Sequence, residues 1–274
     1  MDLENKVKDF LQDMRLGEMS KGTLRTYSNC LSKFIEYAGD KEVTKALMLD
    51  YKDFLSAQGY KKTYINKHIS ALNKFFIWSE SPDLTMKRLK LQQKQYIDNI
   101  PTDADYQRML RFAKRLEQMD TYMIIKTIAN TGVRVEELKF FTVENLSRAI
   151  EVTNKGKTRI VPIRQELLRE LKKYAREHRI KSGSLFPGEN PPKMMDVSTI
   201  WRRIQKVGLA AKIRRDKLHP HALRHYFGKK YLEIAGNTIL DLADILGHDN
   251  VETTRIYNRG TMSETRKKIE RMKY

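Results

Sequence analysis

The stretch from Asp244 to Tyr257, D-I-L-G-H-D-N-V-E-T-T-R-I-Y, decides how the rest of the chain is interpreted. Gly247 predicts the end of one helix, and Asn250 can cap the next, since its side-chain oxygen can accept from free N–H groups of the first turn. Tyr257 then falls about two turns into the second helix. Two interpretations remain open at this point: an ordinary helical corner with a half-buried tyrosine, or a site built from a phenol, a histidine and two threonines.

The composition points to an acidic partner. The 274 residues include 53 basic and 34 acidic side chains, which gives a net charge of +19. Such a surplus favours nucleic acid first and an anionic membrane surface second. No stretch approaches the ~18 apolar residues of a membrane span, and residues 1–20 are too charged for a secretory signal. Cys30 is the single cysteine and fits a reducing compartment, so we expect a core residue and a cytoplasmic protein.

Residues 1–80 predict four amphipathic helices with short connections, which together make a small bundle. Apolar residues recur at helical spacing, and basic residues gather near the expected helix starts, where backbone N–H groups also favour phosphate. A solvated charged face is the plain alternative. We nevertheless predict a surface for the DNA backbone, and its candidate residues are Lys21, Arg25, Lys61, Lys62 and Lys67.

The apolar period is lost between residues 81 and 101. This segment is polar and basic and is bounded by Pro82 and Pro101, so it is expected to be an interdomain linker. Residues 102–274 then form the second domain. The predicted fold class is mainly α with a small antiparallel β-sheet, with the four-helix domain at 1–80 and an α+β domain at 102–274.

Two segments of the second domain place charged side chains at expected turns. In T-G-V-R-V-E-E-L (residues 131–138), Gly132 makes a break, and Arg134 opens a helix with Glu137 on the same face. In residues 149–163, two β-rich runs flank the turn signal N-K-G-K, which predicts a hairpin with Lys155 at its exposed tip. A surface salt bridge and a solubilising turn lysine are the plain alternatives.

A third segment, L-H-P-H-A-L-R-H-Y-F-G (residues 218–228), gathers three of the six histidines around one arginine. Pro220 fits near a helix start, and His221 and Arg224, three residues apart, share a face. This clustering indicates a site, although a histidine beside proline is often only a structural hydrogen-bonder. The preceding helix, expected at 197–207, is predicted to turn Trp201 and Ile204 inward.

In order and local spacing, these three segments and L-G-H-D-N-V-E-T-T-R-I-Y resemble the tyrosine recombinase family of phage-integrase-like and Xer-like proteins. Each segment alone is weak, but their conjunction is specific. The resemblance covers most of the chain: residues 1–80 look like the helical core-binding domain, and residues 102–274 look like the catalytic domain. The stretch between Glu137 and Lys155 is short for the family, so the first strand of the usual small sheet is expected to be vestigial.

The resemblance implies roles for individual residues. Tyr257 matches the nucleophile, and Glu137 matches an acidic position that supports the first arginine. The other positions of the family's catalytic set fall on Arg134, Lys155, His221, Arg224 and His248. The implied reaction breaks and remakes a DNA strand through a 3′-phosphotyrosyl intermediate and a Holliday junction. Neither a metal nor another cofactor is expected, because the arginines supply the positive charge.

The resemblance also implies duplex DNA with inverted half-sites as the partner, with a dimer on each site and a tetramer in the synapse. Thr261 and Glu264 form a T-x-x-E capping box, so a tail helix is expected to begin there. Its apolar stripe is too thin to stand alone in water, so it is expected to pack on its own domain or dock in a neighbouring subunit.

The biological role is open between resolution of chromosome or plasmid dimers, which the size of the chain favours, and integration or excision of a mobile element or virus. Two further hypotheses are a non-catalytic DNA-binding protein and a type IB topoisomerase. The former would lack a covalent adduct, and the latter would act as a monomer without a specific site.

Overall fold

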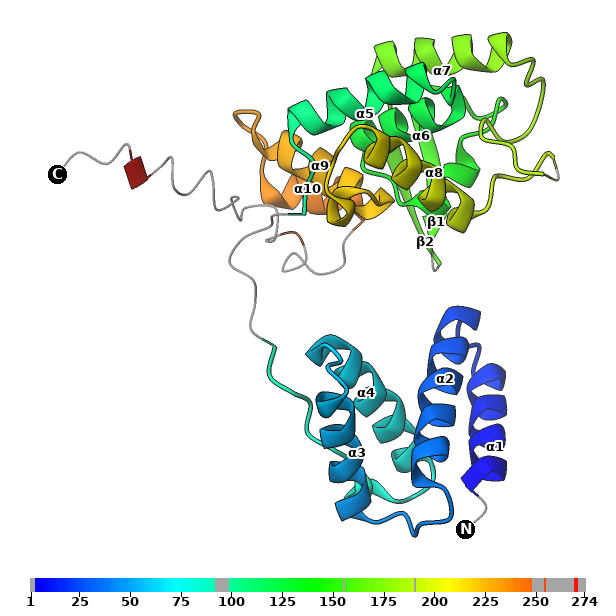
Figure 1. The fold of residues 1–274 in the computed structure, drawn as a ribbon. Coiled ribbons are helices and arrows are strands. Elements are labelled where there is room, and N and C mark those ends of the chain that lie inside the picture. The colour runs from blue at the N-terminus through cyan, green and yellow to red at the C-terminus, as the bar shows by residue number, and fades with distance from the viewer. Residues whose placement is uncertain are drawn as a thin grey trace. The chain divides into compact units, whose positions relative to one another are not determined.

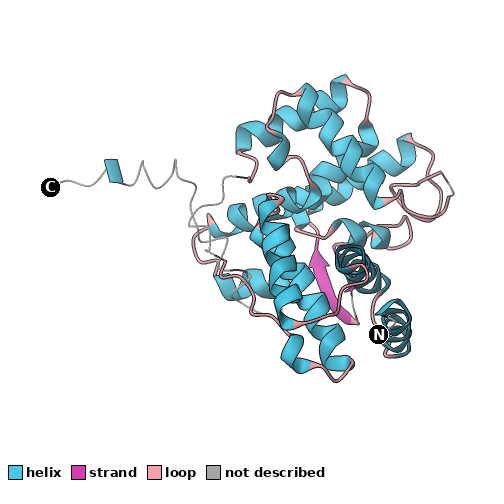
Figure 2. Ribbon diagram, turned by 60° about the horizontal axis from the view of Figure 1, so that its bottom comes forward, coloured by secondary structure: helices cyan, strands magenta, loops and turns pink. Residues whose placement is uncertain are grey.

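The computed structural model describes residues 3–91, 99–154, 156–189, 191–247, 254 and 269–270. The chain divides into two compact units, Met1–Gln93 and Lys94–Tyr274 (Figure 1). Each unit has its own hydrophobic core. The predicted fold class, mainly helical with a small antiparallel sheet of two strands, is confirmed. Figure 2 colours the helices cyan and the strand structure magenta.

The first unit contains four α-helices, α1 (Leu3–Leu16), α2 (Lys21–Ala38), α3 (Lys45–Ala57) and α4 (Lys62–Trp78), followed by the short 3-10 helix η1 (Pro82–Leu84). Ser20 caps α2 and Thr44 caps α3, because each hydroxyl accepts from a backbone N–H three residues on. The α4 helix contacts the other three and supplies Phe75 and Phe76 to the core.

The segment after η1 is fastened along α4 by two asparagine side chains. Asn66 donates to the Leu89 carbonyl at 2.9 Å and accepts from its N–H at 2.7 Å. Asn73 makes the same pair of bonds with Met86, both at 2.8 Å. Met86 is only 4% exposed in this core. Residues 86–89, which lie in the stretch expected to be a linker, therefore pack on the first unit.

The second unit is built around α6 (Met119–Thr131), which contacts α5 (Asp103–Arg115), α7 (Gln165–Glu177), α8 (Val197–Ala210) and α9 (Pro220–Leu232). Both faces of α6 are buried, because apolar and small residues occupy most of its positions. The described part of this unit also contains the 3-10 helices η2 (Val135–Phe140) and η3 (Arg215–Lys217) and helix α10 (Ile239–Leu246).

The hairpin pairs β1 (Ala149–Asn154) with β2 (Lys157–Pro162) in antiparallel register, with Val152 opposite Arg159. Among the described residues, isolated antiparallel bridges also join Thr142 with Ser184 and Pro187 with Met194. The expectation of a reduced first strand agrees with this arrangement. In the described part of the chain, no helix is both long and apolar enough to cross a bilayer.

Candidate active site

Arg134 is placed by a sharp chain reversal. Helix α6 ends at Gly132, whose φ of +65° lies in the left-handed region and whose added Cβ would lie 2.4 Å from a Phe227 ring carbon. Only glycine fits both conditions. Arg134 follows in an extended conformation as the residue before η2. The helix expected after it is a 3-10 helix rather than an α-helix, and Arg134 precedes its first residue.

Glu137 anchors Arg134 from inside the protein. Its side chain is 1% exposed. One carboxylate oxygen accepts from the Arg134 backbone N–H at 2.8 Å, and the other accepts from the Arg134 guanidinium at 3.0 Å. The Arg134 side chain stays 32% exposed, so it keeps donors for a ligand. The resemblance implied such a supporting role for Glu137.

Arg159 on β2 pairs with the same carboxylate. Its two terminal nitrogens donate to the two Glu137 oxygens at 2.7 and 2.8 Å. Burial acts to raise the pKa of Glu137, but the hydrogen bonds from Arg159 and Arg134 outweigh it and bring the pKa to about 2. Glu137 is therefore ionised at neutral pH.

Arg224 is fully buried on α9. The start of this helix is fixed by His219, whose Nδ1 accepts from the Ala222 N–H at 3.0 Å. Pro220 occupies the first helical position, where its missing N–H costs nothing. The Arg224 guanidinium donates to the carbonyl oxygen of Gly132 at 2.5 Å and to that of Leu246 at 2.7 Å. It thus joins the end of α6 to the end of α10.

His221 lies one turn before Arg224 on the same helix. The residue is exposed, but desolvation of its ring at the pocket wall, followed by the charges of Arg224, His219 and Arg134, lowers its pKa. The imidazole is therefore neutral at physiological pH and can accept a proton. Its ring lies edge-on to that of His225, with the centroids 4.6 Å apart.

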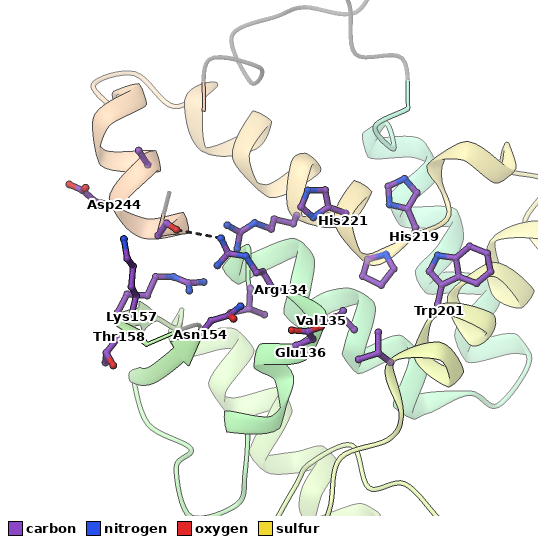
Figure 3. A pocket seen from close by; sticks show the side chains of 17 residues that line it. Arg134, Val135, Glu136, Asn154, Lys157, Thr158, Trp201, His219, His221 and Asp244 are labelled. Atoms are coloured by element: carbon purple, nitrogen blue, oxygen red, sulfur yellow. Dashed lines mark hydrogen bonds between the residues drawn. The ribbon is translucent and has the colours of Figure 1, made fainter. Parts of the chain in front are cut away.

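Arg134, His219 and His221 line one pocket of about 880 Å³. Figure 3 shows Arg134, His221 and the hairpin residues Asn154 and Lys157 around it. Arg224, Arg159 and Gly247 also contribute to the wall. Three of the predicted site residues, Arg134, His221 and Arg224, thus come together from the residue before η2 and from α9.

The other three predicted catalytic residues, Lys155, His248 and Tyr257, lie outside the described residues. For two of them, a chain neighbour belongs to the pocket. Asn154 precedes Lys155 and Gly247 precedes His248, and both line the wall. Within the described ranges, no group of three or more His, Cys, Asp or Glu side chains is arranged to hold a metal ion.

The five predicted DNA-binding residues are all exposed in the first unit. One group lies near the start of α4 and consists of Lys61, Lys62 and Lys67. Lys33 of α2 lies close to this group, because it donates to the Tyr60 hydroxyl at 2.7 Å. Lys21 and Arg25 lie near the other end of α2. With a helical rise of 1.5 Å per residue, they are about 12 to 18 Å from Lys33 along the helix axis. The structure therefore arranges them as two groups rather than one patch.

Two pocket residues were missed from the sequence. Arg159 follows the alternation of β2, on the same face as the buried Val161, and an arginine at an inward strand position is the signal that was available. Trp201 was expected to point inward, and this expectation is wrong. It is 41% exposed and forms part of the pocket wall beside His219 (Figure 3).

Comparison with known proteins identifies the family of the chain. The model of the "Phage integrase family" matches residues 101–264, and that of the "Phage integrase, N-terminal SAM-like domain" matches residues 7–81. The tyrosine recombinase XerA of Pyrococcus furiosus is 29% identical over 97% of this chain and 93% of its own length. The tyrosine recombinase XerD of Vibrio cholerae is 28% identical over 92% of this chain and 90% of its own.

Among solved structures, a XerA recombinase is 27% identical, with a TM-score of 0.54 over the whole of both chains. The structure of Lambda integrase residues 75–356 bound to DNA gives a TM-score of 0.75, covering 94% of this chain and 96% of the other, at 15% identity. That second likeness concerns the fold alone. With the family model spanning more than half of the sequence, the chain belongs to the phage integrase family of tyrosine recombinases.

Proposed function

We propose that this chain cuts and rejoins duplex DNA at specific sites through a transient bond between Tyr257 and a 3′ phosphate. The observation that carries the proposal is the convergence of Arg134, His221 and Arg224 on one pocket. The same wall holds the chain neighbours of Lys155 and His248. This combination supplies cations for a phosphate and groups that can transfer protons.

The chemistry is a reversible exchange of phosphate esters. The Tyr257 oxygen attacks phosphorus and gives up its proton to His221, whose neutral imidazole can accept it. The bond from phosphorus to the 5′ oxygen breaks, and Lys155 protonates that oxygen. Arg134 and Arg224 stabilise the charge that gathers on the non-bridging oxygens, and His248 adds a further donor. The phosphotyrosine keeps the bond energy, so a 5′ hydroxyl can reverse the step on the same strand or a new one.

The DNA partner follows from the charge distribution. The exposed basic residues of the first unit contact the backbone of a half-site, and affinity is expected to fall steeply with salt. Two subunits occupy inverted half-sites, and four meet in the synapse, where strands pass through a Holliday junction. In this scheme residues 1–80, with residues 82–89 packed on them, bind the core site, the residues from there to 101 connect the domains, and 102–274 carry the chemistry of a cytoplasmic enzyme.

For the biological role we propose Xer-like resolution of chromosome or plasmid dimers. The support is that the XerA and XerD relatives align over more than nine-tenths of this chain. Integration or excision of a mobile element is the alternative. A plasmid dimer bearing the cognate site separates the two roles, because a resolvase converts it to monomers without element-encoded partners.

The decisive test concerns Tyr257. A Tyr257→Phe variant should bind half-site DNA normally yet form no SDS-resistant adduct with a nicked suicide substrate. Tyr231→Phe on α9 serves as a matched control and should form the adduct at the normal rate. An undiminished adduct in Tyr257→Phe would remove the nucleophile assignment and leave a DNA-binding role.

The proposal also assigns the tail beyond Thr261 to a neighbouring subunit. Deleting residues 262–274 should leave half-site binding nearly intact and weaken cooperative binding to the full site, as measured by gel shift. Cooperative binding at the wild-type level would place the tail on its own subunit instead.

A further inference from the structure

The carboxyl end of α10 is a point where three arginines meet. The Ile245 carbonyl accepts from the Arg159 Nε at 2.9 Å, and the Leu246 carbonyl accepts from Arg224 at 2.7 Å. The Gly247 carbonyl accepts from Arg134 at 3.4 Å, the contact drawn as a dashed line in Figure 3. Three consecutive carbonyls therefore receive guanidinium groups from β2, α9 and the residue before η2.

Such carbonyls have no partner within their own helix, and they carry the negative end of its dipole. Cations are therefore favoured there. His248 follows the third carbonyl directly in the sequence. The three arginines thus fix both the end of α10 and one another around the pocket.

Arg159 differs from Arg134 in how its donors are used. Each of its three side-chain nitrogens donates to a protein oxygen, one to Ile245 and two to Glu137. Its side chain is 12% exposed, against 32% for Arg134. The side-chain donors of Arg159 are therefore all used within the protein, whereas the Arg134 guanidinium retains exposed donors.

Gly247 gives a separate indication that Arg159 is held in one place. It has a φ of +64°, and a Cβ added there would lie 2.9 Å from the Arg159 Cδ. The methylene chain of Arg159 therefore lies directly against the turn that ends α10. This contact does not depend on the ion pair with Glu137.

We propose that Arg159 is a positioning residue that holds Glu137 against Arg134 and ties the hairpin to the end of α10. With Arg159 bound to both carboxylate oxygens, Glu137 takes only one bond from the Arg134 guanidinium. Without Arg159, the carboxylate is free to take the whole Arg134 fork and draw it from the pocket. The proposal rests on the function proposed above for Arg134.

The same contacts of Arg159 also hold the hairpin in place. Arg159 lies four residues after Lys155 and opposite Val152, which is fully buried. Anchoring Arg159 to Glu137 and Ile245 therefore anchors the strand that leads away from the turn bearing Lys155. One side chain connects the two segments that carry the proposed acid and the first arginine.

The test is the Arg159→Lys variant, which keeps the positive charge but loses the paired guanidinium donors that bind both Glu137 oxygens. Single-turnover cleavage of the suicide substrate at saturating protein should slow on the order of 10- to 100-fold, because small misplacements of catalytic groups are costly. Half-site affinity should stay within about twofold, since the cations of the first unit are unchanged. Arg148→Lys, an exposed arginine just before β1, is the matched control and should cleave normally.

A double variant separates positioning from a general structural effect. If Arg159 acts partly through Arg134, the loss of cleavage rate in the variant that combines Arg134→Lys with Arg159→Lys should be clearly smaller than the product of the two single losses. Losses that multiply would overturn the proposal, as would normal cleavage by Arg159→Lys. Normal cleavage by Arg134→Lys would instead refute the proposed role of Arg134. If Arg159→Lys does not fold, Glu137→Gln can replace it. Cleavage by Glu137→Gln, alone and combined with Arg134→Lys, then tests whether Glu137 acts through Arg134.

Discussion

The two units bury polar groups in opposite ways. In the first unit, Tyr51 and His68 are 0% and 2% exposed and share a hydrogen bond of 2.9 Å. In the second, Arg224 and Glu137 are 0% and 1% exposed and are surrounded by charge-assisted hydrogen bonds. One core contains a neutral pair, and the other contains ions.

The pKa values express the same contrast. Burial, followed by the charges of Lys33 and Lys67, lowers the pKa of His68 to about 4. Burial also raises the pKa of Tyr51 well above its usual range. Both groups are therefore uncharged at neutral pH. Glu137 is ionised in spite of its burial, because two arginines bind it.

A neutral pair is enough to build a core, and buried charge is seldom the more stable choice. The ions of the second unit therefore need a reason beyond stability. Arg224 joins the ends of α6 and α10, and Glu137 joins Arg134 to Arg159. Their placement around the pocket supplies that reason: a fixed cation can meet a phosphate without reorganising.

The largest expected effect comes from disturbing a buried ion. Arg224→Lys keeps the charge but cannot reach the Gly132 and Leu246 carbonyls and a phosphate together. Cleavage at saturating protein should slow by about 100-fold or more, as when one transition-state donor is lost. Half-site binding measured by gel shift should change little. Near-normal cleavage would mean that the buried guanidinium serves the fold alone.

The sequence predicts the members of the site that lie close together in the chain. Arg134 and Glu137 are three residues apart, as are His221 and Arg224, so a turn and a helix are enough to place each pair. The hairpin and the bundle follow from local periodicity in the same way. Those predictions depend on backbone geometry that a few residues determine.

Arg159 could not be assigned by the same reasoning. Its partners lie 22 and 86 residues away, at Glu137 and Ile245, so only the packed fold brings them together. The packing of residues 86–89 along α4 could not be predicted for the same reason, since Asn66 binds Leu89 across 23 residues. Trp201 was assigned inward by its spacing from Ile204, but its position at the edge of the helical stripe leaves it in the pocket wall.

A smaller effect is expected from neutralising Glu137. Glu137→Gln leaves Arg134 and Arg159 facing each other without a counter-charge, and we expect a loss of about 2 kcal/mol in the stability of the second unit. Trp78 lies in the first unit and Trp201 in the second, so fluorescence of a Trp78→Phe chain in denaturant reports the second unit.

The pH dependence sharpens that prediction. The folded pKa of Glu137, about 2, lies below its ordinary value of 4.5. The unfolded chain binds the proton first, so the stabilisation is fully present above about pH 4.5 and is lost as the pH falls toward 2. Glu137→Gln should remove this part of the acid dependence. An unchanged slope below pH 4.5 would show that other carboxyl groups account for it.

The smallest expected effect comes from the neutral pair. Tyr51→Phe removes a hydroxyl and leaves the His68 Nδ1 without that partner, which should cost about 1 kcal/mol. A Trp201→Phe chain reports the first unit through Trp78. Adduct formation by Tyr51→Phe in the otherwise native chain should be normal at saturating protein, because the pair lies within the core of the other unit.

His68 adds a pH signature to this variant. The pKa of His68 in the folded unit, about 4, lies below its ordinary value of 6.5. Between these two pH values the unfolded chain therefore binds a proton that the folded unit does not bind. The stability of the first unit should therefore fall as the pH falls from about 6.5 toward 4. Tyr51→Phe should keep this slope, because burial, the leading cause of the low pKa, remains. If Tyr51→Phe instead slowed cleavage with stability unchanged, the neutral pair would serve the reaction, and the contrast between the two cores would fail.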